Sequence, residues 1–116
     1  MIIVVGSVDG RSESFDRLVK ISLEHVHRSR GEDGCIEHVV QIDCDNPLRL
    51  RFFERWRDAA ALKAHFARPE SRVFVQEVAK LCAKPPVNGR LRGRGKADLE
   101  PTGQVPKLPR LKSPSL

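Results

Sequence analysis

The 116-residue chain lacks an apolar run long enough to span a membrane, because its longest apolar opening, residues 2–5, has only the length of a strand. No basic, apolar and small-residue secretory signal opens it. Cysteine is scarce: Cys35, Cys44 and Cys82 cannot all pair, and they follow no C-x-x-C metal spacing, a pattern typical of reduced thiols. We therefore expect a cytoplasmic protein without a membrane partner.

The sequence also lacks the motifs of common cofactor sites. No Gly-rich phosphate loop follows a predicted strand, and no dinucleotide fingerprint is present, so we expect neither flavin nor nicotinamide. His25 and His27 are two residues apart on a predicted helix, where they diverge by about 200° and cannot chelate one ion together. We expect no cofactor and no metal site built by this chain alone.

Basic charge is concentrated near the C-terminal end. Residues 1–86 hold 14 Lys and Arg against 13 Asp and Glu, whereas residues 87–116 hold seven against two, with four of the eight Gly and four of the eight Pro. We predict a folded domain over 1–86 and a basic extension over 87–116, with a short strand near 87–92. Its Arg/Gly run occurs once and has no aromatic residue for base stacking, so we expect no nucleic acid partner; the alternative is an arm that clasps another chain.

Hydrophobic periodicity over residues 1–86 predicts three strands and three helices. Strands are expected over 2–8, 35–44 and 48–56. Helices are expected over about 15–30, with Leu23 in the apolar stripe, over a short segment capped by Asp58, and over 70–82. Asp45-Asn46-Pro47 is expected to form the turn between the second and third strands. With a final strand, this order predicts an α+β, ferredoxin-like sandwich whose helices cover one face of an antiparallel sheet. Because the other face also carries apolar residues, we expect a homodimer with its sheets face to face.

Several segments together resemble the antibiotic-biosynthesis monooxygenase family over residues 1 to about 86. They are the apolar first strand, Glu32-Asp33-Gly34-Cys35, Phe53-Glu54-Arg55-Trp56 and the run from Ala59 to His65. The resemblance implies a dimeric α+β barrel with a pocket between sheet and helices. It further implies oxidation of small aromatic or quinol-like substrates by molecular oxygen, without metal or flavin.

Two departures from the family pattern narrow this expectation. Haem-degrading members place an Asn near the end of the first strand, beside a Trp and a His. Here Gly6 and Ser7 occupy that stretch, so only Trp56 and His65 match and we do not expect haem cleavage. The family's last strand is normally richer in apolar residues than residues 87–96, so we expect that strand to be short, replaced or swapped with a partner.

His65 is the predicted catalytic residue, because a neutral imidazole is a suitable base for a phenol or quinol proton. The alternative is a partly buried histidine bonded to backbone. Trp56 and Phe52 are predicted to orient a flat substrate, although a large aromatic residue is more often core. Glu54 shares the strand face of Trp56 and Phe52 and is also predicted at the pocket. His38, on an apolar face of the second strand, is predicted there too, although a lone histidine in such a place is more often a core or interface residue. For Glu54 we favour a structural hydrogen bond, since a buried carboxylate needs a partner.

These observations support two hypotheses of different classes. The first is a cofactor-independent monooxygenase acting on a small aromatic or quinol-like ligand. The alternative is a non-catalytic ligand-binding or interaction module with the same fold. A cavity that His65 faces would favour the enzyme, and a filled core there would favour the module.

Overall fold

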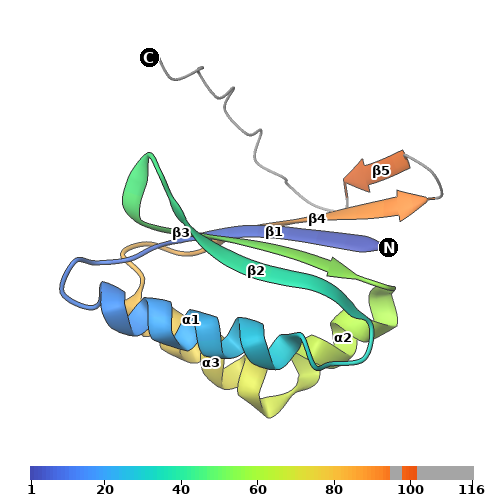
Figure 1. The fold of residues 1–116 in the computed structure, drawn as a ribbon, viewed down its shortest axis with the longest axis horizontal. Coiled ribbons are helices and arrows are strands. Elements are labelled where there is room, and N and C mark those ends of the chain that lie inside the picture. Colours follow the sequence, from blue (N-terminus) through green and yellow to red (C-terminus); the bar gives the residue numbers. More distant parts are fainter. Residues whose placement is uncertain (95–97, 102–116) are drawn as a thin grey trace.

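The computed structural model describes residues 1–94 and 98–101, in which all helices lie on one side of a single sheet (Figure 1). The elements are β1 (Ile2–Asp9), α1 (Phe15–Ser29), β2 (Cys35–Asp43), β3 (Asn46–Trp56), α2 (Ala59–Ala67), α3 (Pro69–Leu81), β4 (Val87–Arg94) and β5 (Asp98–Pro101). The antiparallel strands are ordered β2-β3-β1-β4-β5. The predicted α+β, ferredoxin-like fold is confirmed.

β1 lies at the centre of the sheet, which explains why its residues are apolar on both faces. It pairs with β3 along its whole length and with β4 over Ile2–Ser7. Ile2, Val4 and Val8 are buried beneath the helices. The alternation of side chains along each strand then sets which residues of the neighbouring strands face the helices.

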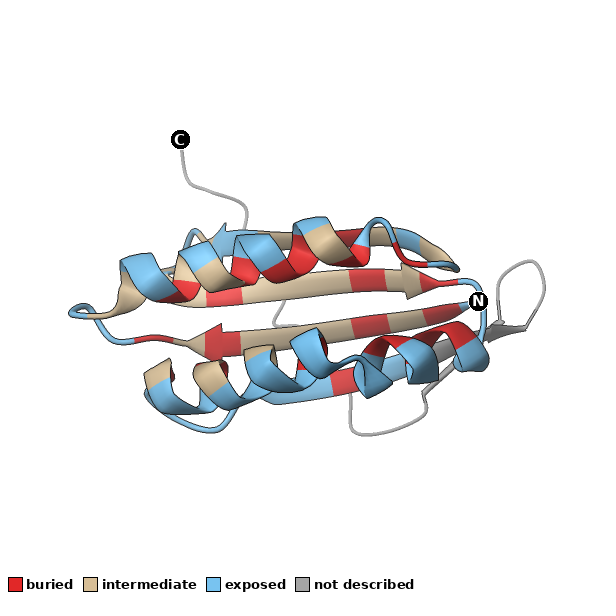
Figure 2. Cartoon of the chain, turned by 90° about the horizontal axis from the view of Figure 1, so that it is seen from below, coloured by how far each residue is buried: buried red, intermediate tan, exposed pale blue. Residues whose placement is uncertain are grey.

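α1 buries a narrower face than its Leu and Val pattern predicts. Its buried residues are Leu18, Ser22, His25, Val26 and Ser29, and Figure 2 shows them recurring along one side of the helix. Leu23, expected in the apolar stripe, is 39% exposed. Small serines take the inner positions instead, and the Ser29 hydroxyl donates a hydrogen bond to the His25 carbonyl at 2.6 Å. The inner face of α1 therefore carries a histidine among small side chains.

α2 and α3 meet at Arg68. Asp58 caps α2 as expected, because its Oδ1 accepts a hydrogen bond from the Ala61 amide at 2.9 Å. Pro69 interrupts the helical run and also begins α3, where a proline costs no hydrogen bond. His65 therefore lies in the last turn of α2, close to the start of α3.

Two segments differ from the expected boundaries. The hairpin turn is Cys44-Asp45, so β3 begins at Asn46 and contains Pro47. Proline is tolerated there because the β2–β3 register shifts at this point and β1 pairs only from Arg49. β4 spans Val87–Arg94 and extends the sheet beyond the predicted domain boundary. The rest of the expected extension, 95–97 and 102–116, lies outside the described residues. No described helix has both the length and the apolar content needed to cross a membrane.

The sheet face opposite the helices carries an apolar row and a set of ion pairs. Val39, Phe53 and Val5 are direct cross-strand neighbours, and all three are half-buried. Around them, short bonds join Arg49 to Asp9 at 2.6 Å, Arg51 to Asp43 at 2.8 Å and Arg55 to Glu37 at 2.7 Å. No helix within residues 1–94 covers this face (Figure 1).

Candidate active site

A cavity of about 260 Å³ lies between the sheet and the helices. The sheet contributes cross-strand rows to its floor: His38, Glu54, Val4 and Arg90 in one, and Phe52, Gly6 and Asn88 in the next. The helices contribute His25 from α1, His65 and Phe66 from α2, and residues of α3 such as Phe74. The cavity therefore combines apolar walls with polar side chains, among them three histidines and Glu54.

His65 is held by a carboxylate from the α1–β2 loop. Its Nδ1 lies 2.9 Å from Oε1 of Glu32, which also forms an ion pair with Arg68, whose Nε is 3.2 Å away. Burial lowers the pKa of His65, and the hydrogen bond to Glu32 opposes that shift. Because a carboxylate accepts, Nδ1 carries the proton and Nε2 keeps its lone pair. The pair therefore orients a neutral imidazole whose second nitrogen is free of Glu32.

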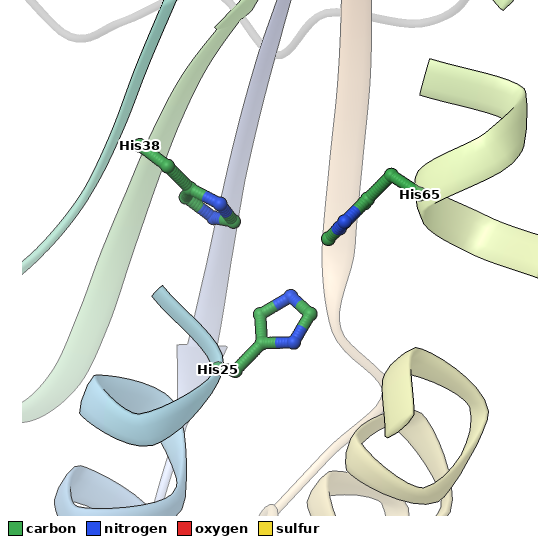
Figure 3. A group of neighbouring side chains, drawn as sticks. All are labelled: His25, His38 and His65. Atoms are coloured by element: carbon green, nitrogen blue, oxygen red, sulfur yellow. The ribbon is translucent and has the colours of Figure 1, made fainter. Parts of the chain in front are cut away.

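His65 belongs to a cluster of three buried histidines from three elements (Figure 3). The ring centres of His25 and His38 are 5.4 Å apart, those of His25 and His65 are 5.0 Å apart, and those of His38 and His65 are 5.8 Å apart. Burial lowers the pKa of both His25 and His38 to about 3, aided by the neighbouring imidazoles. All three rings are therefore neutral near pH 7.

Glu54 faces the cavity beside this cluster. Its Oε1 accepts a hydrogen bond from the Trp56 indole at 2.9 Å, and its Oε2 lies 3.8 Å from His38 Nε2. Burial raises the pKa of Glu54 to about 7, although the Trp56 bond acts in the opposite direction. The hydrogen bond expected for this carboxylate thus comes from Trp56.

Four of the five predicted site residues, His38, Phe52, Glu54 and His65, line the cavity. Trp56 does not line it. Trp56 is completely buried in a cluster with Ile2, Val4, Ala61 and Leu62, and its ring centre lies 4.7 Å from that of His65. Trp56 is therefore a core residue, which was the alternative to its predicted role at the pocket. From the core it packs against His65 and donates a hydrogen bond to Glu54.

Sequence reasoning did not select His25, Glu32, Asn88 or Arg90. His25 follows the buried Leu18 by seven residues, two helical turns, and that spacing was an available signal. Glu32 lies in a loop, and its neighbours in the sequence do not indicate a contact with His65. Asn88 is placed by Gly6: a Cβ on Gly6 would lie 2.7 Å from Asn88 Oδ1, so the glycine leaves room for this amide. Arg90 lies at the cavity with its Cζ 5.1 Å from the Phe66 ring centre.

Comparisons with known proteins agree on one family. The model of the antibiotic biosynthesis monooxygenase family matches residues 1–77. An uncharacterised protein of Synechocystis sp. is 33% identical over 84 residues, which are 72% of this chain and 57% of that relative. The chain therefore spans little more than half the length of this curated relative.

Solved structures show the same fold. A Mycobacterium tuberculosis protein superposes with a TM-score of 0.76 at 24% identity, covering 84% of this chain and 98% of its own. A Deinococcus radiodurans protein, described as a candidate antibiotic biosynthesis monooxygenase, gives a TM-score of 0.79 at 20% identity, covering 86% and 99%. On the family match, the chain belongs to the antibiotic biosynthesis monooxygenase family.

Proposed function

We propose that this protein is a monooxygenase that oxidises a small aromatic or quinol-like substrate with molecular oxygen and no bound cofactor. The observation that carries the proposal is the Glu32–His65 pair, whose histidine lines a cavity with apolar walls. A base held in a defined tautomer beside an apolar site is what deprotonation of a phenol requires. Family membership supports the same reaction type.

The reaction balances without an external reductant. His65 Nε2 accepts a hydroxyl proton, and the resulting phenolate transfers an electron to oxygen. Recombination of the substrate radical with superoxide forms a ring peroxide that carries both oxygen atoms. Loss of the ring proton at that carbon and cleavage of the O–O bond leave one oxygen atom on the ring as a carbonyl. The second oxygen atom leaves as water, and the substrate supplies all four electrons. The apolar walls, including Phe52 and Phe74, would exclude water from the reactive intermediates.

The residues around His65 have separate roles in this proposal. Glu32 is a positioning residue, because it holds the His65 ring and stabilises the imidazolium that proton transfer creates. Phe52, Glu54 and His38 would contact the substrate from the sheet. Trp56 would act indirectly, by fixing the Glu54 carboxyl and packing against His65.

We also propose that the protein is a homodimer joined through the sheet face opposite the helices. The apolar row Val39–Phe53–Val5 would form the centre of the interface, and the Arg–acid pairs around it would form its polar rim. This arrangement would place both cavities on the outer sides of the dimer, because each lies between its own sheet and helices.

The test is oxygen consumption by chelator-treated protein across a panel of quinols, anthrones and other electron-rich phenols. His65→Gln should lower the turnover of an accepted substrate by about 10²–10⁴-fold, the usual contribution of a general base. His27→Gln is the matched control, because His27 lies on the exposed side of α1 and should leave turnover unchanged. Wild-type turnover by His65→Gln would contradict the base assignment.

The non-catalytic module is a second candidate, and the position of Trp56 favours it. With Trp56 in the core, only Phe52 of the two aromatic residues expected to orient a flat substrate lines the cavity. In that case panel compounds would bind, as seen by chemical-shift changes of cavity residues, but no compound would raise oxygen consumption above that of His65→Gln.

A further inference from the structure

We propose that His25, His38 and His65 form a binding site for one divalent transition-metal ion, whose remaining coordination position opens to the cavity. The three side chains come from α1, β2 and α2, and each offers a ring nitrogen within 4.8 Å of the other two. Figure 3 shows the His25 ring directing one nitrogen at the gap between His38 and His65.

The spacing of the rings matches three imidazoles on a tetrahedral ion. A zinc–nitrogen bond of about 2.1 Å places each ring centre about 3.2 Å from the metal, so two ring centres are separated by about 5.2 Å. The observed separations are 5.0, 5.4 and 5.8 Å. Ligand nitrogens on such an ion are about 3.4 Å apart. The ring nitrogens, which lie within 4.8 Å of one another, must therefore move closer together when the ion binds.

The bonding state of His38 points to a missing ligand. This side chain is 1% exposed, yet neither ring nitrogen has a hydrogen-bond partner among the described residues. A buried imidazole without a partner is costly, and a metal ion would satisfy it.

His65 already has the outer partner of a metal-bound histidine. Its Nδ1 donates to the Glu32 carboxylate, which leaves Nε2 as the ligand atom and increases its basicity. Metal-binding histidines almost always make such a bond to a carboxylate, carbonyl or water. Glu32 would therefore serve the metal without touching it.

Arg28 opposes metal binding at His25. Its Nη2 lies 3.0 Å from His25 Nδ1, and because a guanidinium only donates, the His25 proton is on Nε2. A metal needs the Nε2 lone pair, so binding must move that proton to Nδ1 and displace Arg28. The arginine should therefore weaken the site, and its removal should strengthen it.

The three imidazole ligands determine which metal ions the site would bind. An all-imidazole set suits Zn²⁺, Cu²⁺, Ni²⁺ and Co²⁺, whereas Mg²⁺ and Ca²⁺ prefer oxygen ligands. Occupancy would also use the His65 lone pair that takes the substrate proton. The metal should therefore inhibit the oxidation, a consequence that rests on the proposed function, whereas the site itself does not.

The direct experiment follows the imidazole ¹H–¹⁵N correlations of the four histidines while Zn²⁺ is added to the chelator-treated full chain. Signals of His25, His38 and His65 should change and saturate at one equivalent, and those of His27 should stay unchanged as an internal control. Mg²⁺ should have no effect. Unchanged signals from the three cluster histidines, or a response at His27 alone, would overturn the proposal. This experiment uses only the wild-type chain, so its result does not depend on whether a variant folds.

Variants then assign the ligands through the visible absorption of bound Co²⁺. His25→Gln should abolish the wild-type spectrum, and His27→Gln should keep it. Glu32→Gln should weaken Co²⁺ binding by about 10–100-fold, the usual cost of losing such a partner. Arg28→Gln should tighten it. An identical Co²⁺ spectrum and affinity in folded His25→Gln would contradict the three-histidine site, whatever the oxidation assay shows.

Discussion

Single buried polar residues determine what the cavity can do, because each one has a partner that sets its proton or its orientation. Trp56 fixes Glu54 through one indole bond, and Glu32 fixes His65 through one carboxylate bond. In both cases the partner lies outside the cavity lining. Chemistry at this site therefore depends on residues that a substrate would not touch.

Asp9 shows the same dependence in a purely structural setting. Its carboxylate lies at the end of β1, is only 14% exposed, and meets Arg49 Nε at 2.6 Å and Lys84 Nζ at 2.9 Å. The hydrogen bond from Arg49 is the main cause that lowers the pKa of Asp9. Because the pKa of Asp9 is lower in the folded chain, its ionised form stabilises the fold. This stabilisation is complete above the pKa of Asp in the unfolded chain, near 4, and is lost as the pH falls through the lower pKa of the folded chain.

Asp9→Asn should therefore lower the free energy of unfolding by about 1–2 kcal/mol at pH 7, the range for a charged hydrogen bond with partly exposed partners. The difference from wild type should shrink as pH falls below about 4. Urea unfolding at pH 7, 4 and 2.5 measures it. Asp45→Asn, at an exposed turn residue, should show no such dependence. An Asp9→Asn deficit of equal size at every pH would contradict the ionic origin.

Residue types and spacing located part of the site. His38, Phe52, Glu54 and His65 lie on strand or helix faces that periodicity identifies, and all four line the cavity. Glu32 could not be predicted, because its contact with His65 joins positions 33 residues apart through a loop. The three-histidine cluster could not be predicted from spacing along one helix, because its members come from three separate elements that converge in the fold.

At the scale of elements, the α1–β2 loop links the site to the fold. Gly34 has a φ of +84°, a conformation that favours glycine, and its carbonyl accepts a bond from the Arg57 amide at 2.8 Å. A Cβ at Gly34 would also collide with the Ala61 Cβ at the start of α2. The same loop carries Glu32. The backbone at Gly34 thus helps to hold Glu32 opposite His65.

Gly34→Ala should lower the free energy of unfolding by about 1–3 kcal/mol, through the strained backbone and the clash with α2. Gly31→Ala is the control, since a Cβ there meets only the Arg28 carbonyl at 3.6 Å. Thermal unfolding of the two variants measures the difference. Equal melting temperatures would show that the loop tolerates a side chain at Gly34.

Most elements were predictable from periodicity, and the errors have identifiable causes. The order of elements follows from alternation in strands and from the Asp58 cap. The α1 face was misjudged at Leu23 because serines, which periodicity ignores, take buried positions. Pairing with the central β1 stabilises residues 87–92 of β4, a segment of weak strand propensity, and the two residues beyond the expected end, Gly93 and Arg94, pair with β5.

At the scale of the whole molecule, the face opposite the helices is the expected dimer interface. Its apolar row crosses three strands, and Phe53 is its largest side chain. Phe53→Glu should therefore convert the proposed homodimer into a monomer, because it would place two carboxylates at the centre of a face-to-face interface. Light scattering after size-exclusion chromatography measures the mass. A wild-type monomer, or a dimeric Phe53→Glu, would contradict this interface.

The central claim is that His65, oriented by Glu32, takes a proton from a substrate that then reacts with oxygen. The most direct measurement is product analysis under ¹⁸O₂ with chelator-treated protein and a quinol that the wild type oxidises. We predict one ¹⁸O atom in each product molecule, one O₂ consumed per product, and an approximately proportional loss of both in His65→Gln. Product without ¹⁸O, or equal labelling rates in His65→Gln and the wild type, would contradict the account.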